Sequence, residues 1–281
     1  MDLENIKINR VIHKEFKKCG FCGRNLKPIG FDYLYFNISE EFIEYGRCNC
    51  KEAQEYWKQK DLENFKTENR KKYIEIIKKI YKDIYLSKRL QKCSLENFIV
   101  EENEKEIDIV KNYIEKCINK NEQNGLIITG NSGTGKTHLA AAIANKLIGN
   151  GQIVLFGRLS YLVDMVKDTF YDDSKSEKDL MDLYSNIDML VIDDLGTEKI
   201  SQWVLEKLFI IISNRYDNNL PIIITTKFNK NQLFNRFEQS KDKTLTEAAI
   251  LKIYQMCYGI HLRNNYFNKK EKASTSDQTK C

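Results

Sequence analysis

A glycine-rich octapeptide from Gly130 to Thr137 restricts the fold of this chain more than any other segment. It reads Gly-Asn-Ser-Gly-Thr-Gly-Lys-Thr, follows the apolar run 126–128 and precedes a helical pattern over 136–148. A glycine-rich loop between a buried strand and a helix lets backbone N–H groups surround phosphate oxygens, and the helix N-terminus adds the positive end of its dipole. The octapeptide therefore predicts a phosphate-binding P-loop.

The residues of this loop are expected to bind ATP with Mg²⁺. Lys136 is expected to reach the β- and γ-phosphates, and the hydroxyl of Thr137 is expected to bind Mg²⁺. The candidates for nucleotide contacts are Gly130, Asn131, Ser132, Gly133, Thr134, Gly135, Lys136, Thr137 and His138.

Polar residues at the ends of two other apolar runs are further candidates. Asp193 and Asp194 follow the run 189–192. We expect Asp193 to hold Mg²⁺ through water, and Asp194 to orient the attacking water or accept its proton. Thr226, after the run 222–224, is the candidate for a polar group between the acidic strand and the γ-phosphate. A threonine that caps a helix is the alternative.

The pattern from residue 94 onward predicts an α/β fold. Strands are expected at 126–128, 153–156, 189–192, 222–224 and 260–262, and helices at 106–118, 136–148, 160–170, 176–186, 201–217, 230–238 and 246–257. Ser160 and Ser176 are expected to cap two of these helices. Continuous apolar strands separated by helices indicate a parallel sheet that is covered on both faces.

Four of the eight cysteines lie in the first 50 residues, as Cys19-x-x-Cys22 and Cys48-x-Cys50. Four thiolates can surround Zn²⁺ tetrahedrally, and a bound metal would supply folding energy to a segment with little apolar mass. Reduced thiols in a small domain are the alternative, and His13 is a weak alternate ligand. A short strand is expected at 31–36.

Residues 51–92 hold the excess of positive charge, with 13 basic and 7 acidic side chains. An apolar stripe at 74, 77, 81 and 84 predicts an amphipathic helix over about 51–90. Such a helix can meet nucleic acid phosphates, and a solvated helix face is the alternative. No signal peptide and no apolar run of membrane-spanning length are apparent, so a cytoplasmic protein without disulfides and without a membrane partner is expected.

Three motifs together carry a resemblance to a known family. The segments 130–140, 191–199 and 222–226 resemble those of the DnaC/DnaI-like bacterial helicase loaders, which are AAA+ ATPases, over about residues 94–265. The cysteine-bearing front resembles the zinc-bearing N-terminal region of loaders from Gram-positive bacteria and their phages. The closely similar IstB-like transposition helper ATPases share the motor motifs.

The resemblance implies a domain organisation and partners. It implies a zinc-binding, helicase-interaction domain at 1–55, a basic helical linker at 56–93, an AAA+ ATPase domain at 94–267 and a disordered tail at 268–281. Such an ATPase assembles in several copies on the replicative DNA helicase and helps to place that ring on single-stranded DNA.

Two positions depart from the family pattern. Lys227 stands where the family has Asn after the strand, and Lys252 stands where the family has an Arg that acts on a neighbour's γ-phosphate. Lys lacks the planar fork of Arg, and Arg236 is the alternative residue for this role. We therefore expect ATP hydrolysis that is slow or that needs a partner.

Single-stranded DNA contacts are expected on the predicted helix 160–170 and after the acidic strand. Aromatic rings can stack on bases and lysines can meet phosphates, which makes Lys199 and the set Tyr161, Lys167, Phe170 and Tyr171 candidates. The alternative for Tyr161 and Phe170 is a place in the core. Three functions stay open: a helicase loader, a transposition helper, and a binding module whose nucleotide site is a remnant.

Overall fold

The computed structural model describes residues 17–27, 45–81, 86–99, 102–171, 176–238 and 242–263. His13, the strand expected at 31–36 and the tail 268–281 lie outside these ranges. The chain divides into two compact units, residues 1–71 and 72–281, and the division falls within helix α1 (Lys51–Tyr81). The helix expected over about 51–90 is described from Lys51 to Tyr81, residues 82–85 lie outside the described ranges, and a short 3₁₀ helix η3 (Leu90–Lys92) follows.

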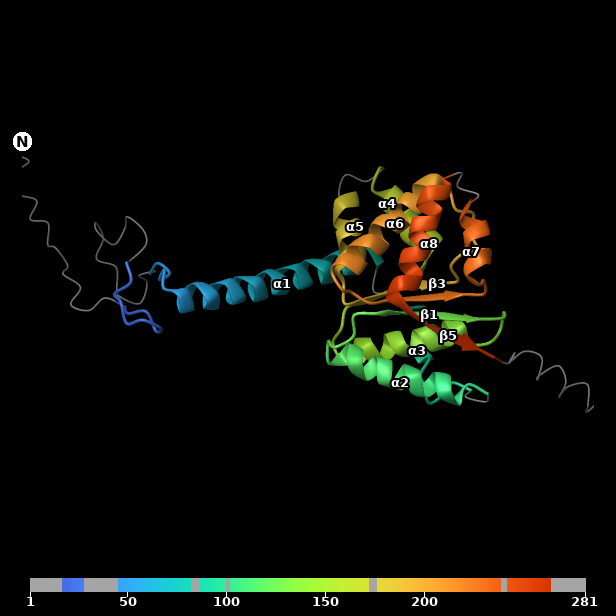
Figure 1. Cartoon of the computed structure of the whole chain (residues 1–281), viewed down its shortest axis with the longest axis horizontal. Coiled ribbons are helices and arrows are strands. Elements are labelled where there is room, and N and C mark those ends of the chain that lie inside the picture. The colour runs from blue at the N-terminus through green and yellow to red at the C-terminus, as the bar shows by residue number, and fades with distance from the viewer. Residues whose placement is uncertain are drawn as a thin grey trace, which may run out of the picture. The chain divides into compact units, whose positions relative to one another are not determined.

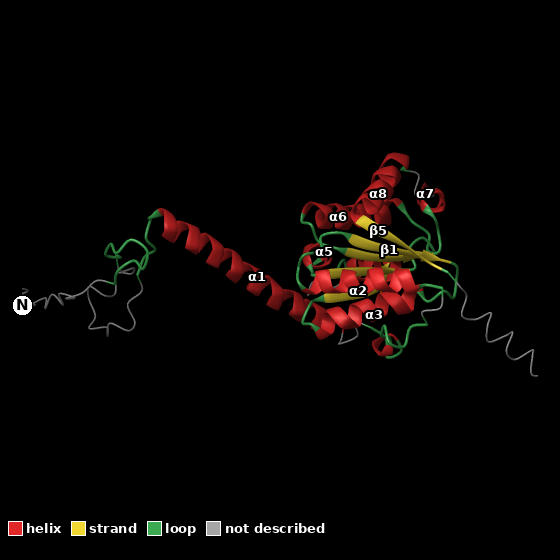
Figure 2. Ribbon diagram, turned by 60° about the horizontal axis from the view of Figure 1, so that its bottom comes forward, coloured by secondary structure: helices red, strands yellow, loops and turns green. Residues whose placement is uncertain are grey.

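The second unit is built on a parallel sheet of five strands (Figure 1, Figure 2). The strands are β1 (Gly125–Gly130), β2 (Val154–Arg158), β3 (Met189–Asp193), β4 (Ile222–Thr226) and β5 (Cys257–Leu262). Their order in the sheet is β2-β3-β4-β1-β5, with β1 between β4 and β5. All pairings are parallel, which confirms the predicted fold class.

Helices cover both faces of this sheet (Figure 1). One face carries α2 (Glu104–Ile118) and α3 (Lys136–Gly149), and the other carries α4 (Leu159–Asp168), α5 (Glu177–Asn186), α6 (Gln202–Asp217) and α8 (Lys243–Met256), with α7 (Lys230–Phe237) beside α8. Side chains alternate along β1: Leu126 and Ile128 pack with α2 and α3, whereas Ile127 packs with the other layer. Two apolar clusters thus fix the sheet between its helices.

Short polar caps begin several of these helices. The side chains of Ser176, Ser201 and Asp242 each accept a backbone N–H three residues ahead. The prediction for Ser160 is wrong, because α4 begins one residue earlier, at Leu159, and its N-cap is Arg158, whose side chain caps nothing.

The last turns of α1 belong to the second unit. Tyr73 and Ile77 are buried in the same apolar cluster as α5, and the Tyr73 hydroxyl donates to Asp182 at 2.8 Å. Lys72 forms an ion pair with Asp179 at 2.7 Å. Of the expected apolar stripe, Ile77 is therefore buried and Ile74 packs partly buried against the same cluster, whereas the side chains at 81 and 84 are outside what the structure describes. Across the described ranges, every helix is too short or too polar to cross a bilayer.

Candidate functional site

The loop after β1 has the backbone shape of a phosphate cradle. Gly130 and Gly135 have φ of 145° and 91°, in the region that favours glycine. A Cβ at Gly130 would lie 2.5 Å from the carbonyl oxygen of Leu262, and one at Gly135 would lie 2.8 Å from the ring of Phe98. Neither position can hold a side chain without displacing its surroundings, so both glycines are required for this loop to curl onto the start of α3.

Lys136 lies within this loop and is nearly buried. Its Nζ donates to the carbonyl oxygens of Gly130 at 2.9 Å and Asn131 at 2.7 Å. Burial lowers the pKa of Lys136, and the carboxylates of Asp194 and Asp193 oppose this effect. The ammonium is therefore held at the loop by neutral carbonyl acceptors. Phosphate oxygens are charged and would be stronger acceptors in their place.

Asp193 gathers two hydroxyl groups at the end of β3. Thr137 Oγ1 donates to its Oδ1 at 2.9 Å, and Thr225 Oγ1 donates to the same oxygen at 2.6 Å. Asp193 is 6% exposed. A hydroxyl and a carboxylate side by side are the hard oxygen ligands that Mg²⁺ takes, so this donor set fits the expected ion.

Asp194 and Glu198 follow β3 in a sharp turn. Asp194 has φ of 58°, and its backbone N–H donates to Thr225 Oγ1 at 2.8 Å. Glu198 accepts from the Thr197 hydroxyl at 3.2 Å, while its Oε1 is buried and has no hydrogen-bond partner among the described residues. Burial raises the pKa of Glu198. The sequence motifs did not single out this second carboxylate near the site.

Thr226, the threonine predicted to face the γ-phosphate, has its hydroxyl engaged in the turn after β3 and the start of the loop after β4. Its hydroxyl donates to the carbonyl of Leu195 at 2.7 Å and accepts from the N–H of Phe228 at 3.1 Å, and the residue is fully buried. Its neighbour Thr225 faces Asp193 instead, because successive side chains of a strand point to opposite faces. Thr226 thus holds a turn, and Thr225 is the threonine of the site.

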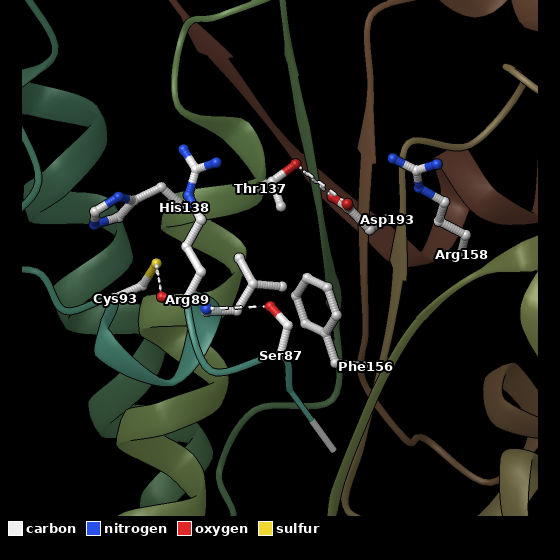
Figure 3. A pocket seen from close by; sticks show the side chains of 9 residues that line it. Ser87, Arg89, Cys93, Thr137, His138, Phe156, Arg158 and Asp193 are labelled. Carbon is white, nitrogen blue, oxygen red and sulfur yellow. Dashed lines mark hydrogen bonds between the residues drawn. The ribbon is translucent and has the colours of Figure 1, made fainter. Parts of the chain in front are cut away.

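His138 points away from Thr137 in Figure 3, although it is the next residue. Its Nε2 lies 2.8 Å from Asn97 Oδ1, and its ring packs edge-on against Phe98 at 5.6 Å. Asn145, two turns further along α3, donates to the carbonyls of Leu90 and Cys93. These side chains fasten residues 86–98 to α3, and a nucleotide contact of His138 stays a prediction.

The two candidates for a trans-acting cation are both engaged within their own chain. Arg236 donates from Nε to the carbonyl of Gly196 at 2.9 Å. Lys252 donates to the Ser213 hydroxyl at 3.3 Å and lies 5.1 Å from the centre of the Tyr216 ring. Lys227 lies near Lys136, since its charge contributes to the lowered pKa of Lys136.

The first unit brings the four predicted zinc ligands together. The Sγ atoms of Cys19, Cys22, Cys48 and Cys50 all lie within 4.8 Å of one another. The sulfur–sulfur distances of 3.9 Å for Cys19–Cys50 and 3.5 Å for Cys22–Cys48 are close to the ~3.8 Å that tetrahedral Zn–S bonds of about 2.3 Å require.

Arg24 is positioned to stabilise thiolate charge in this cluster. Its backbone N–H and then its side chain lower the pKa of Cys22 to about 6, and its Nε donates to Cys22 Sγ at 3.4 Å. Thiolates are the form that binds metal, so the donor set fits Zn²⁺.

An aromatic patch with two lysines lies along α4, the residues just after it and α6, and its lysines are paired, Lys167 with Asp164 and Lys207 with Glu177. Phe170 is 58% exposed and Tyr161 is 46% exposed, so the alternative that they are core residues is wrong. Trp203 packs against Phe170 with ring centres 6.2 Å apart, and Lys167 and Lys207 each place Nζ 5.5 Å from the Trp203 ring. Trp203 and Lys207 were missed because they lie about 35 residues from Phe170 in the sequence.

Comparisons with known proteins agree with this geometry. A family model described as IstB-like ATP binding protein matches residues 62–275. The replicative helicase loader DnaC of Escherichia coli (strain K12) is 38% identical over 109 residues, which are 38% of this chain and 44% of that protein. The replicative helicase loader DnaI of Bacillus subtilis (strain 168) is 28% identical over 130 residues, which are 45% of this chain and 41% of that protein.

A solved structure extends the comparison to the fold. The crystal structure titled as that of the DnaC helicase loader superimposes with a TM-score of 0.53 at 26% identity, and covers 63% of this chain and all of that chain (100%). The parallel sheet with its two helical layers is therefore the AAA+ fold that the motifs predicted. The match spans less than half the length of the two curated relatives.

Proposed function

The chain belongs to the IstB-like ATP-binding protein family, and from this premise we propose that it is an ATP-dependent loader of the replicative DNA helicase. It would place that helicase on single-stranded DNA when replication begins. The observation that carries the proposal is the meeting of Lys136, Thr137 and Asp193 at one edge of the sheet, in a chain whose curated relatives are named replicative helicase loaders.

The chemistry that we propose for this site is phosphoryl transfer to water. The loop N–H groups and Lys136 would bind the phosphates of ATP, and Thr137 and Asp193 would hold Mg²⁺, which neutralises phosphate charge when bound. Asp194 would orient the attacking water or accept its proton. Little covalent chemistry falls to the protein, so positioning and charge decide the rate. Slow, partner-stimulated turnover follows from the engaged side chains of Arg236 and Lys252.

The partners follow from the same proposal. Residues 1–55 with bound zinc would grip the helicase, residues 56–93 would link the two domains, residues 94–267 would bind ATP and single-stranded DNA, and 268–281 would be a tail. Several copies would associate on the helicase ring, in the cytoplasm. The alternative is an IstB-like transposition helper, which the name of the matching family favours. The cysteine cluster favours the loader, because it matches the zinc-bearing front expected of one.

Co-purification tests the proposal. Tagged full-length chain, incubated with the replicative helicase of its host and with ATP, should retain the helicase on an affinity column and should raise helicase transfer to single-stranded DNA. The Lys136→Ala chain should lose the ATP-dependent part of this transfer. Retention of a transposase, with no retention of helicase, would favour the alternative and reject the loader.

Zinc removal should unfold the first unit. We expect about one zinc per chain by elemental analysis, and none in a Cys22→Ser, Cys48→Ser double variant, because two thiolates cannot hold the ion. Trp57 packs against the cluster, so in a Trp203→Phe background its fluorescence should shift when a chelator is added. Cys93→Ser, which keeps a donor to the Arg89 carbonyl, is the matched control and should retain zinc. A metal-free wild-type chain would reject the site.

The aromatic patch should bind single-stranded DNA. Loss of a ring that stacks on a base costs ~1–3 kcal/mol, so we expect Phe170→Ala or Trp203→Ala to weaken binding roughly 5- to 150-fold. Fluorescence anisotropy of a labelled oligonucleotide would measure this. Tyr258→Ala removes a ring of similar exposure (48%) on β5 and should leave affinity unchanged. Equal losses in all three variants would mean that the effect is not local to the patch. Lys199, which is exposed after β3, is proposed to contact a phosphate of the bound single-stranded DNA.

A further inference from the structure

A pocket of about 470 Å³ lies beside the proposed Mg²⁺ ligands (Figure 3). Thr137 and Asp193 form part of its wall, and residues 87–93, which are fastened to α3, form another part. The end of β2 completes it with Phe156 and Arg158. The pocket therefore lies beside the cradle, at the ends of β3 and β2.

Two arginines in this pocket have uncommitted guanidinium groups. Neither Arg89 nor Arg158 makes a side-chain hydrogen bond or an ion pair with a described residue, and both side chains are exposed. Arg158 is paired with Asp193 in the register of β2 and β3. In the view of Figure 3, the two guanidinium groups lie on either side of the Thr137–Asp193 pair and extend in the same direction.

The charge of Arg158 interacts with the carboxyl of Glu198, which follows β3. Its charge opposes the raised pKa of Glu198, whereas the charge of Asp194 adds to it. Arg158 caps no helix and forms no ion pair with a carboxylate of the described residues, so its planar fork is available for phosphate oxygens. Arg236 and Lys252, the other candidate cations for the γ-phosphate, form hydrogen bonds within their own chain.

We propose that Arg158, assisted by Arg89, contacts the γ-phosphate end of bound ATP within the same chain. This rests on the proposed function, which places Mg·ATP in the cradle. In hydrolysis the water oxygen bonds to the γ-phosphorus while the bond to the β–γ bridging oxygen breaks; that electron pair leaves with ADP, and the water proton passes to Asp194. The fork of Arg158 neutralises charge on the equatorial oxygens during this step, as a finger supplied in cis.

Binding measurements separate this role from a structural one. Full-length Arg158→Ala should keep its affinity for fluorescent Mg·ADP within about 2-fold, but should lose ~10-fold or more in affinity for a non-hydrolysable ATP analogue, as loss of a hydrogen bond to a charged group predicts. It should also fail to trap ADP with aluminium fluoride. Arg158→Lys should fall between wild type and Ala, because the charge remains without the fork. Lys111→Ala, an exposed cation on α2, is the control and should behave as wild type.

Turnover measurements separate a cis role from a trans role. We expect Arg158→Ala to lower turnover ~100-fold or more. Mixing it with Lys136→Ala, whose Arg158 is intact, would restore turnover if the arginine acted on a neighbour; we expect no restoration. Restoration, or an Arg158→Ala chain that binds both nucleotides and traps aluminium fluoride as wild type does, would overturn the inference while leaving the ATP site intact. A wild-type chain that binds no nucleotide would overturn both the inference and the proposed function.

Discussion

The Lys136→Ala chain should bind Mg·ATP far more weakly than the wild type and should lose ~100- to 1000-fold or more in turnover. The ammonium now rests on the carbonyls of Gly130 and Asn131, and ATP would offer it charged phosphate oxygens in their place. Loss of hydrogen bonds to a charged group costs ~1.5–3 kcal/mol each, so affinity should fall at least about 10-fold. Titration with a fluorescent ATP analogue and release of inorganic phosphate would measure the two effects.

A variant on the same helix controls this result. Lys146→Ala removes an exposed cation from the last turn of α3 and should leave both quantities unchanged. The Lys136→Ala chain should still fold, because burial lowers the pKa of Lys136 and the lost ammonium carried a desolvation cost in the free protein. Wild-type affinity in a folded Lys136→Ala chain would show that the loop is not the nucleotide site.

The sequence predicts the frame of this site because the frame depends on local patterns. Five apolar runs gave the five strands, and glycines with Lys136 and Thr137 gave the cradle between β1 and α3. A parallel sheet brings the carboxyl ends of its strands to one edge. Asp193 could therefore be expected near Thr137 from sequence alone, across 56 positions, and the two side chains form a 2.9 Å hydrogen bond in the structure.

The sequence left two kinds of detail open: which of two neighbouring side chains faces the site, and which residues far apart in the sequence bond to each other. Thr225 and Thr226 differ by one position on a strand, and only the register of β4 against β3 decides which of them faces Asp193. His138 lies about 100° around the helix from Thr137, which turns its ring toward Phe98. The acceptor for Arg236 is the loop carbonyl of Gly196, 40 residues away, and no local pattern indicates such a contact.

Arg158 shows the same limit in a functional residue. Nothing in its sequence neighbourhood indicates phosphate chemistry, since it ends an ordinary apolar strand and begins α4. Its place beside the cradle follows from the order of the sheet, in which β2 is the neighbour of β3. A cation at the end of β2 can therefore reach toward the acidic end of β3, although 35 residues separate Arg158 from Asp193.

Removal of the buried guanidinium of Arg215 should be the most destabilising single change considered. Arg215 is fully buried, and it donates to the carbonyls of Tyr184, Ile187 and Pro221. These bonds join the end of α5, the approach to β3 and the approach to β4. In Arg215→Met the three buried carbonyls lose this donor at ~1 kcal/mol or more each, so we expect the free energy of unfolding to fall by at least ~3 kcal/mol.

Denaturant unfolding would measure this loss in the second unit alone. The chain has two tryptophans, so a Trp57→Phe background leaves Trp203 as the reporter of residues 72–281. Arg215→Lys should lose less than Arg215→Met, because it keeps a charged donor but cannot reach three carbonyls with one nitrogen. Lys116→Ala, an exposed cation on α2, should change stability by less than ~0.5 kcal/mol.

The expected order of the variants follows from burial. Burial lowers the pKa of Arg215 to about 9, so the guanidinium remains protonated at neutral pH, where the carbonyl dipoles and the charge of Asp188 compensate its charge. Bulk water cannot reach the three carbonyls that Arg215 now bonds, because the residues around them are buried as well. A loss below ~1 kcal/mol for Arg215→Met would mean that water enters and replaces the donor, and the three bonds would then not be what joins α5 to the approach to β4.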